Sequence, residues 1–271
     1  MAPFVDVNND GMYNAFDGDY PHPAGLDPSF LPGQIIWNVF NDAYGKFLDV
    51  PLGVEVHQTA WALVCDTDSL LNETVFFNFK ITNKSAAALD SFFAGIWMLP
   101  LLGNFYDDGF GTSVEHNGMF VFNVDNLDEK VQFSNKPYHF GANPPVFTFS
   151  CLNRPLYKSV YHFFPRLCDP PLNMLDPGNA TEYFRNLNGY WKDGAPQTRT
   201  NIGYDWANTG APIAPYIYPE DPNDPDGWSF YANNTICRFD AAILPSFYFN
   251  QLKPDSAVSL DQAFSYHSGP G

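Results

Sequence analysis

The chain has 271 residues, of which 45% are hydrophobic and 17% aromatic, so it can bury a sizeable core and is not intrinsically disordered. Thirty Asp and Glu residues against thirteen Lys and Arg give a formal net charge of −17, which repels the phosphate backbone of nucleic acids and anionic lipid surfaces. We therefore expect no nucleic-acid binding. We also expect no membrane insertion, because no apolar run approaches the roughly 18 residues of a membrane helix.

The first motif along the chain is an acidic loop over residues 6–17, which reads Asp-Val-Asn-Asn-Asp-Gly-Met-Tyr-Asn-Ala-Phe-Asp. Oxygen donors recur where a twelve-position calcium loop needs them, and Gly11 occupies the sharp turn, which requires a left-handed backbone. The expected ligands are the side chains of Asp6, Asn8, Asp10, Asn14 and Asp17 and the carbonyl of Met12. The alternative interpretation is a solvated polar turn.

The end of this loop indicates a structural role for the ion. Asp17 stands where a signalling EF-hand has a bidentate Glu, and Pro21 and Pro23 prevent an exiting helix. The loop is therefore similar to the helix-free calcium loops of extracellular repeats. We assign residues 1–24 to a calcium-binding-type loop with a Pro-rich lead-in, and residues 25–271 to a β-sandwich domain.

Beyond the lead-in, apolar and polar residues alternate in runs separated by turn residues, which predicts β-strands. The plainest runs are 54–63 and 75–82. Further strands are predicted at 92–98, 119–124, 146–149, 236–244 and 258–265.

One segment, 180–191, has helical spacing, because Tyr183, Leu187 and Tyr190 share a face and Asn179 or Thr181 can cap it. Twenty-four prolines and twenty glycines argue against long helices. We predict an all-β fold, an antiparallel β-sandwich of the jelly-roll or immunoglobulin-like kind with long loops and at most one or two short helices.

The cysteines give no metal signal. No CxxC occurs, and the six histidines are scattered, so a zinc site is not expected. Structural cystines or buried thiols are expected instead, with three pairings open and the 151–168 loop the shortest to close. The four are Cys65, Cys151, Cys168 and Cys237.

Catalytic motifs are absent from the sequence, including the nucleophile elbow, the phosphate-binding glycine loop and the HExxH helix. A glycoside hydrolase needs only two carboxylates at a set separation. The carboxylates to suspect are Glu55, Asp107, Asp108 and Glu115. Asp107 and Asp108 are equally candidates for a second calcium ion. We consider an enzyme less expected than a structural protein.

Tryptophans suggest a carbohydrate-binding surface as another alternative, because sugar rings stack on exposed aromatic side chains. Trp206 and Trp228 lie in polar loop sequence and are the candidate glycan contacts. Trp61 and Trp97 lie within predicted strands, where we expect them to belong to the core.

Several phrases, read in order, resemble those of large exported surface proteins of the Bacteroidetes, of the class with a C-terminal type nine secretion sorting domain. The phrases are Asp6-Val-Asn-Asn-Asp-Gly, Trp37-Asn-Val-Phe-Asn-Asp, Pro51-Leu-Gly-Val-Glu-Val, Phe79-Lys-Ile-Thr-Asn-Lys-Ser, Gly103-Asn-Phe-Tyr-Asp-Asp, Gly141-Ala-Asn-Pro-Pro, Trp191-Lys-Asp-Gly-Ala-Pro and Leu252-Lys-Pro-Asp. The resemblance implies export to the cell surface or the medium and a β-rich module within a longer chain. It implies no known catalytic residues.

The first thirty residues lack the basic start and apolar run of a signal peptide, so we expect this chain to be a segment of a longer polypeptide. The function that we expect is an extracellular, calcium-stabilised structural or adhesive module of a bacterial surface protein. Its partners would be glycans or other surface proteins.

Overall fold

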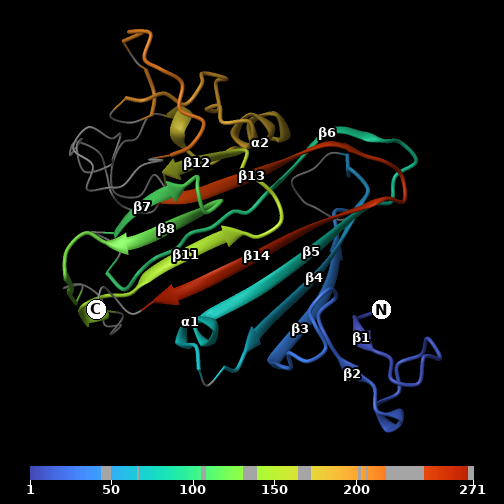
Figure 1. Ribbon diagram of the computed structural model, residues 1–271. Helices are drawn as coiled ribbons and strands as arrows, with labels where there is room; N and C mark the ends of the chain where they lie inside the picture. The colour runs from blue at the N-terminus through green and yellow to red at the C-terminus, as the bar shows by residue number, and fades with distance from the viewer. Residues whose placement is uncertain are drawn as a thin grey trace.

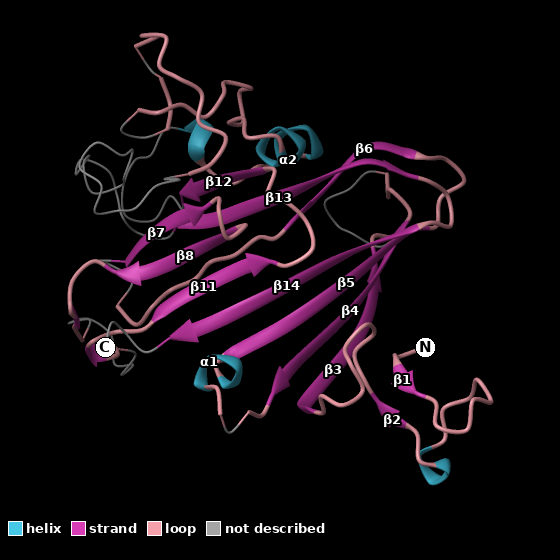
Figure 2. Cartoon of the chain, viewed as in Figure 1, coloured by secondary structure: helices cyan, strands magenta, loops and turns pink. Residues whose placement is uncertain are grey.

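A computed structural model describes residues 1–43, 50–65, 67–104, 108–130, 139–163, 172–200, 203–205, 207–217 and 241–267. Within these ranges the chain consists mainly of antiparallel strands and contains two short α-helices, which confirms the predicted all-β class. Figures 1 and 2 show a large twisted sheet with a smaller sheet stacked over one part of it, a sandwich-like arrangement.

The large sheet has seven strands in the order β3-β4-β5-β14-β11-β8-β7. All neighbouring strands in it are antiparallel. The strand bounds are β3 Pro32–Asn41, β4 Val54–Leu63, β5 Thr74–Asn83, β7 Asp108–Ser113, β8 Gly118–Asn123, β11 Val146–Cys151 and β14 Ala257–His267. The last strand of the chain, β14, thus lies in the interior of the sheet, between β5 and β11.

The smaller sheet has the order β12-β13-β6, with β12 at Lys158–Phe163, β13 at Ala241–Leu252 and β6 at Leu89–Gly95. Phe247 and Phe249 of β13 pack against Phe149 of β11 and Leu260 of β14, and all four side chains are at most 5% exposed. These aromatic and aliphatic side chains form the core between the two layers, and their burial is the main stabilising contribution to the fold.

Shorter elements flank the sheets. The helix α2 (Ala180–Leu187) packs on the outer face of the smaller sheet, and α1 (Ser69–Asn72) precedes β5 (Figure 1). The remaining elements are β1 Phe4–Val5 paired with β2 Tyr20–Pro21, β9 Leu127–Asp128 paired with β10 Gly141–Ala142, and the 3-10 helices Ala15–Asp17 and Leu172–Met174.

The predicted strands at 54–63, 75–82, 119–124, 146–149 and 258–265 are confirmed as β4, β5, β8, β11 and β14. The strand predicted at 92–98 begins and ends earlier, as β6, and Met98 instead forms an isolated bridge with Ile243. The strand predicted at 236–244 corresponds to the start of β13, and residues 236–240 lie outside the described residues.

The predicted helix at 180–191 is shorter than expected. Asn179 caps it through a hydrogen bond from the Glu182 amide to Asn179 Oδ1 at 3.1 Å. It ends at Leu187 because Gly189, with φ of 76°, turns the chain out of the helix.

Two of the four cysteines can be placed. Cys65 and Cys151 carry free thiols, and Cys151 is 3% exposed in the core between the sheets. Cys168 and Cys237 lie outside the described residues.

Candidate functional site

The predicted calcium loop closes on the carboxylate of Asp6. Asp6 Oδ2 accepts a hydrogen bond from the amide of Gly11 at 2.7 Å, and Oδ1 accepts one from the amide of Asp10 at 3.3 Å. Gly11 has φ of 77°, the left-handed backbone expected at the turn. The first, fifth and sixth positions of the twelve-residue loop therefore lie side by side.

Asn8 belongs to the same group. Its side-chain amide donates to Asp10 Oδ2 at 3.1 Å, and its Oδ1 accepts from the Asp10 amide at 3.2 Å. Asp10 Oδ1 accepts from the amide of Met12 at 2.7 Å. The Met12 side chain is 67% exposed and extends into solvent, so the contribution of Met12 to the loop is its backbone.

The last two predicted ligands form a second group. The side-chain amide of Asn14 donates to Asp17 Oδ2 at 2.7 Å, and Asn14 Oδ1 caps the 3-10 helix by accepting from the Phe16 amide at 3.1 Å. The structure therefore brings together Asp6, Asn8 and Asp10, and separately Asn14 and Asp17.

Asp19 joins the two groups, and sequence reasoning missed it. Its carboxylate is 4% exposed, and it accepts hydrogen bonds from the amides of Val7 at 2.9 Å and Asn14 at 2.8 Å. Asp19 lies outside the twelve-position pattern, so nothing in the ligand spacing marks it. Its role follows from the three-dimensional closeness of residues 7 and 14.

The donor chemistry of the loop fits a hard cation. All six predicted donors are oxygens, and carboxylate oxygens retain lone pairs beyond those used by the hydrogen bonds described above. Three of the six are charged and three neutral, and the structure does not bring the three carboxylates of Asp6, Asp10 and Asp17 into one group. Across the described ranges, no three His, Cys, Asp or Glu side chains form a group able to hold a metal.

The carboxylates considered for a second ion or for catalysis are dispersed. Asp107 lies outside the described residues, and Asp108, 6% exposed at the start of β7, accepts from the Leu102 amide at 2.7 Å. Glu55 lies on β4, five strands from β7 in the sheet order, a separation of about 24 Å at the usual strand spacing. Glycoside hydrolases place their two carboxyl groups within about 10 Å of each other, so Glu55 and Asp108 do not form such a pair.

Glu55 and Glu115 have ordinary surface surroundings. Glu55 Oε1 lies 2.9 Å from His57 Nε2 and 3.6 Å from Lys84 Nζ. The hydrogen bond with His57, helped by the charge of Lys84, lowers the pKa of Glu55, so this carboxyl is not suited to donating a proton near neutral pH. Glu115 is exposed in the turn between β7 and β8.

Neither of the two tryptophans expected in the core is fully buried. Trp206 and Trp228, the candidate glycan contacts, lie outside the described residues. Trp61 is half-buried and stacks on Phe76 with ring centroids 5.6 Å apart. Trp97, expected in the core, is instead 37% exposed. It follows β6 and lies on the outer side of the smaller sheet, which is covered by the short helix α2 and not by a second sheet.

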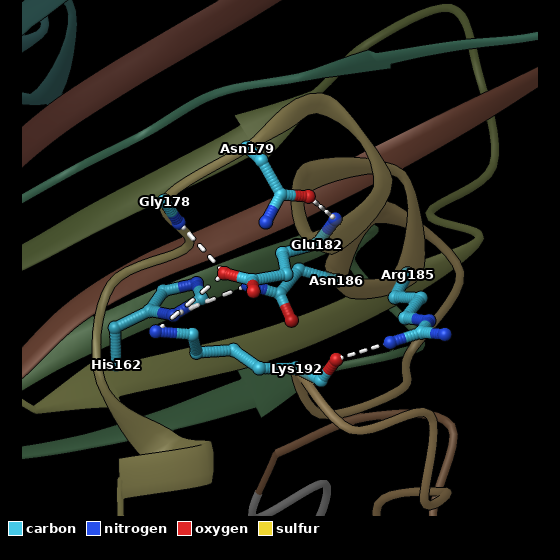
Figure 3. Close-up of polar contacts among 7 residues, drawn as sticks. All are labelled: His162, Gly178, Asn179, Glu182, Arg185, Asn186 and Lys192. Carbon is cyan, nitrogen blue, oxygen red and sulfur yellow. Dashed lines mark hydrogen bonds and ion pairs between the residues drawn. The ribbon is translucent and has the colours of Figure 1, made fainter.

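A polar network fixes that helix, α2, to the smaller sheet (Figure 3). Glu182 Oε2 accepts from the amide of Gly178, the residue before the N-cap, at 2.7 Å, while the Glu182 amide donates to Asn179. Lys192 Nζ lies 3.5 Å from the same Glu182 oxygen. The Arg185 guanidinium donates to the Lys192 carbonyl and holds the segment after the helix against it.

His162 lies beneath this network and was not singled out by the sequence, because its neighbours become apparent only in the fold. Its side chain is 1% exposed, and Nδ1 accepts from the Asn186 side-chain amide at 3.4 Å. Nε2 has no hydrogen-bond partner in the structure. Burial, assisted by the charge of Lys192 and opposed by the nearby Leu175 backbone, lowers the pKa of His162 to about 3, so the imidazole is neutral at physiological pH.

Comparison of the sequence with models of known protein families found no match, and comparison with curated protein sequences found no similar protein.

Of the helices in the described ranges, none combines the length and the hydropathy that a membrane crossing requires.

Proposed function

We propose that this chain is an extracellular, calcium-stabilised structural or adhesive module of a bacterial surface protein. The observation that carries the proposal is the closure of residues 6–11 around the Asp6 carboxylate, which places Asn8 and Asp10 beside it. The residues that would hold the ion are Asp6, Asn8, Asp10, Asn14, Asp17 and the carbonyl of Met12.

The supporting physical argument is electrostatic. Asp10 is exposed, and its backbone amide donates to the Asp6 carboxylate, so two acidic residues are held next to each other in the loop. Like charges held together repel, and a divalent cation between them would convert that repulsion into attraction. An ion bound there would stabilise the N-terminal segment, whose connection to the large sheet runs directly into β3.

The proposal extends to location and role through two further observations. The strongly acidic surface suits a medium that contains free calcium, and the order of the sequence phrases resembles exported Bacteroidetes surface proteins. Glu55 and Asp108 lie too far apart in the sheet to form the carboxylate pair of a glycosidase, so this pair gives catalysis no support.

Calorimetric melting in a few millimolar calcium and in chelator tests this proposal. Calcium should raise the melting temperature of the wild-type chain, and Asp10→Ala should abolish that increase. Asp27→Ala is the matched control, since Asp27 also accepts a turn hydrogen bond, from the Ser29 amide at 2.8 Å, but lies outside the loop. A wild-type melting temperature that is the same in calcium and chelator would contradict calcium binding.

A further inference from the structure

A groove of about 620 Å³ runs between the edge of β6 and the helix α2, far from the calcium-type loop. One wall is made by residues 88–93, and the other by α2, with Val50 and Leu52 at one end. The lining is mostly apolar.

The first wall is the edge of a strand. Successive side chains of a strand point to opposite faces, so a cavity that touches six consecutive residues lies along the edge and not against one face. β6 pairs with β13 on one side, for example Phe93 with Tyr248, and it ends the order of the smaller sheet. In the described part of the chain no strand pairs with its other side, so backbone donors and acceptors face the groove.

Ser91 interrupts the regular ladder in the same wall, because the β6–β13 register includes Phe92 and Asp90 but not Ser91. Its φ is 51°, a left-handed conformation that a non-glycine residue adopts at an energetic cost. A partner strand would therefore pair with β6 on either side of Ser91.

The second wall is an apolar stripe of the helix. Ala180, Tyr183, Phe184 and Leu187 recur at the spacing of one helical face, and all four line the groove. Tyr183 is 42% and Phe184 52% exposed, although neighbouring residues of α2 are fixed by the network of Figure 3. Ser246 Oγ of β13 donates to the Leu187 carbonyl at 2.7 Å and anchors the end of the helix to the sheet. These contacts hold this wall in place through bonds that do not involve the groove-lining side chains.

Charge indicates which partner fits. Asp90 is the one charged residue among those lining the groove, and one of its oxygens already accepts from Gln251. A second copy of this chain, with its formal charge of −17, is repelled at long range. A basic segment is attracted, and a neutral one is not repelled.

We propose that the groove binds an extended peptide segment of another protein, which adds to β6 as a further strand. Its backbone would pair with the free edge of β6, alternate apolar side chains would pack on Tyr183 and Phe184, and a basic side chain would approach Asp90. A segment of about six residues spans the wall, since a strand rises about 3.3 Å per residue. This inference goes beyond the calcium module and is independent of it, because no residue of the loop lines the groove.

The test is selection of phage-displayed peptides of about seven residues on the full chain, followed by anisotropy titration of a labelled synthetic peptide. Enriched peptides should alternate apolar residues and contain an excess of Lys and Arg. Phe184→Glu should weaken peptide binding at least about tenfold. Asp90→Lys should weaken the binding of basic peptides more than that of neutral ones. Leu172→Glu, at a 77% exposed apolar residue outside the groove, should leave affinity unchanged.

Strand addition makes one further demand. Two versions of the peptide are compared, each N-methylated at alternate residues but along opposite edges of the strand. Methylation along the edge that pairs with β6 should abolish binding, and methylation along the other edge should have little effect. Equal effects of both methylation patterns, binding that is indifferent to Phe184→Glu in a normally folded variant, or failure to enrich any peptide would each overturn the proposal. Capture of palmitate instead of peptides would likewise overturn it in favour of an acyl chain.

Discussion

The indole ring of Trp97 lies nearly flat on the imidazole of His162, with ring centroids 4.6 Å apart and planes inclined by 14°. A partly exposed aromatic residue thus covers a buried titratable one. The stack excludes water from a side chain whose Nε2 has no hydrogen-bond partner. His162 is therefore the group in this region whose protonation the fold opposes most strongly.

The stability of the protein should fall as the pH is lowered below about 6.5. The pKa of His162 in the folded protein is about 3, below the ordinary value of 6.5, so between these pH values the unfolded chain binds a proton that the folded chain does not. Between pH 7 and pH 5 this group should remove about 2 kcal/mol of stability. Denaturant unfolding of wild type and His162→Gln over this range measures the difference. A pH dependence that is the same in both would show that His162 is not responsible.

Asp19→Ala should loosen the N-terminal loop while leaving the sheets intact. The substitution removes the acceptor of two backbone amides, and a hydrogen bond to a charged group contributes about 1.5–3 kcal/mol. Losing that much free energy of local opening should make hydrogen exchange of the Val7 and Asn14 amides at least about tenfold faster. Asp17→Ala is the control, because Asp17 accepts from the Asn14 side chain and not from these amides. Unchanged exchange at Val7 in Asp19→Ala would be contrary to the role assigned here.

Gly118→Ala should destabilise the large sheet. A Cβ at this position would lie 2.4 Å from the Phe149 carbonyl oxygen, a backbone atom of the neighbouring strand that cannot move aside without breaking the β8–β11 pairing. We expect a loss of about 1–3 kcal/mol, the usual range for overpacking. Gly178→Ala provides the control, since its nearest neighbour would be Glu182 Oε2 at 3.7 Å. Urea midpoints that fall equally in both variants would rule out the steric explanation.

The two free thiols that can be placed should react at very different rates. Cys65 is partly exposed, and hydrogen bonding, first with the Thr67 side chain, lowers its pKa. Burial raises the pKa of Cys151 and also blocks access to it. Peptide mapping after brief iodoacetamide treatment at pH 8 should find Cys65 modified first and Cys151 protected until the chain is denatured. Early modification of Cys151 would mean that the core between the sheets opens readily.

Strands with clear alternation could be predicted from sequence, but others could not. β5 shows the pattern plainly, with Phe77 and Phe79 on one face and Asn78 and Lys80 on the other. β7 was missed because Gly109 and Gly111 have little strand preference by themselves. Its strand conformation depends on pairing with β8, and Gly111 is required there since a Cβ would lie 2.5 Å from the Phe120 ring.

The candidate site shows the same division. The spacing of Asp6, Asn8 and Asp10 identified a loop whose local closure the structure describes. Asp19 and His162 could not be found, because their roles depend on distances between separate segments. The placement of Trp97 was wrong because alternation indicates which face a residue occupies, but not whether another layer covers that face.

The interior position of β14 has a consequence during synthesis of the chain. Both β5 and β11 pair with β14, which leaves the ribosome well after both of them. In the β5–β14 register, for example, Phe79 pairs with Leu260. Until that strand arrives, the nascent protein carries two half-sheets with unpaired inner edges, a state prone to intermolecular association. Completion of the sheet is therefore a late, long-range event, and we expect slow folding that benefits from chaperones.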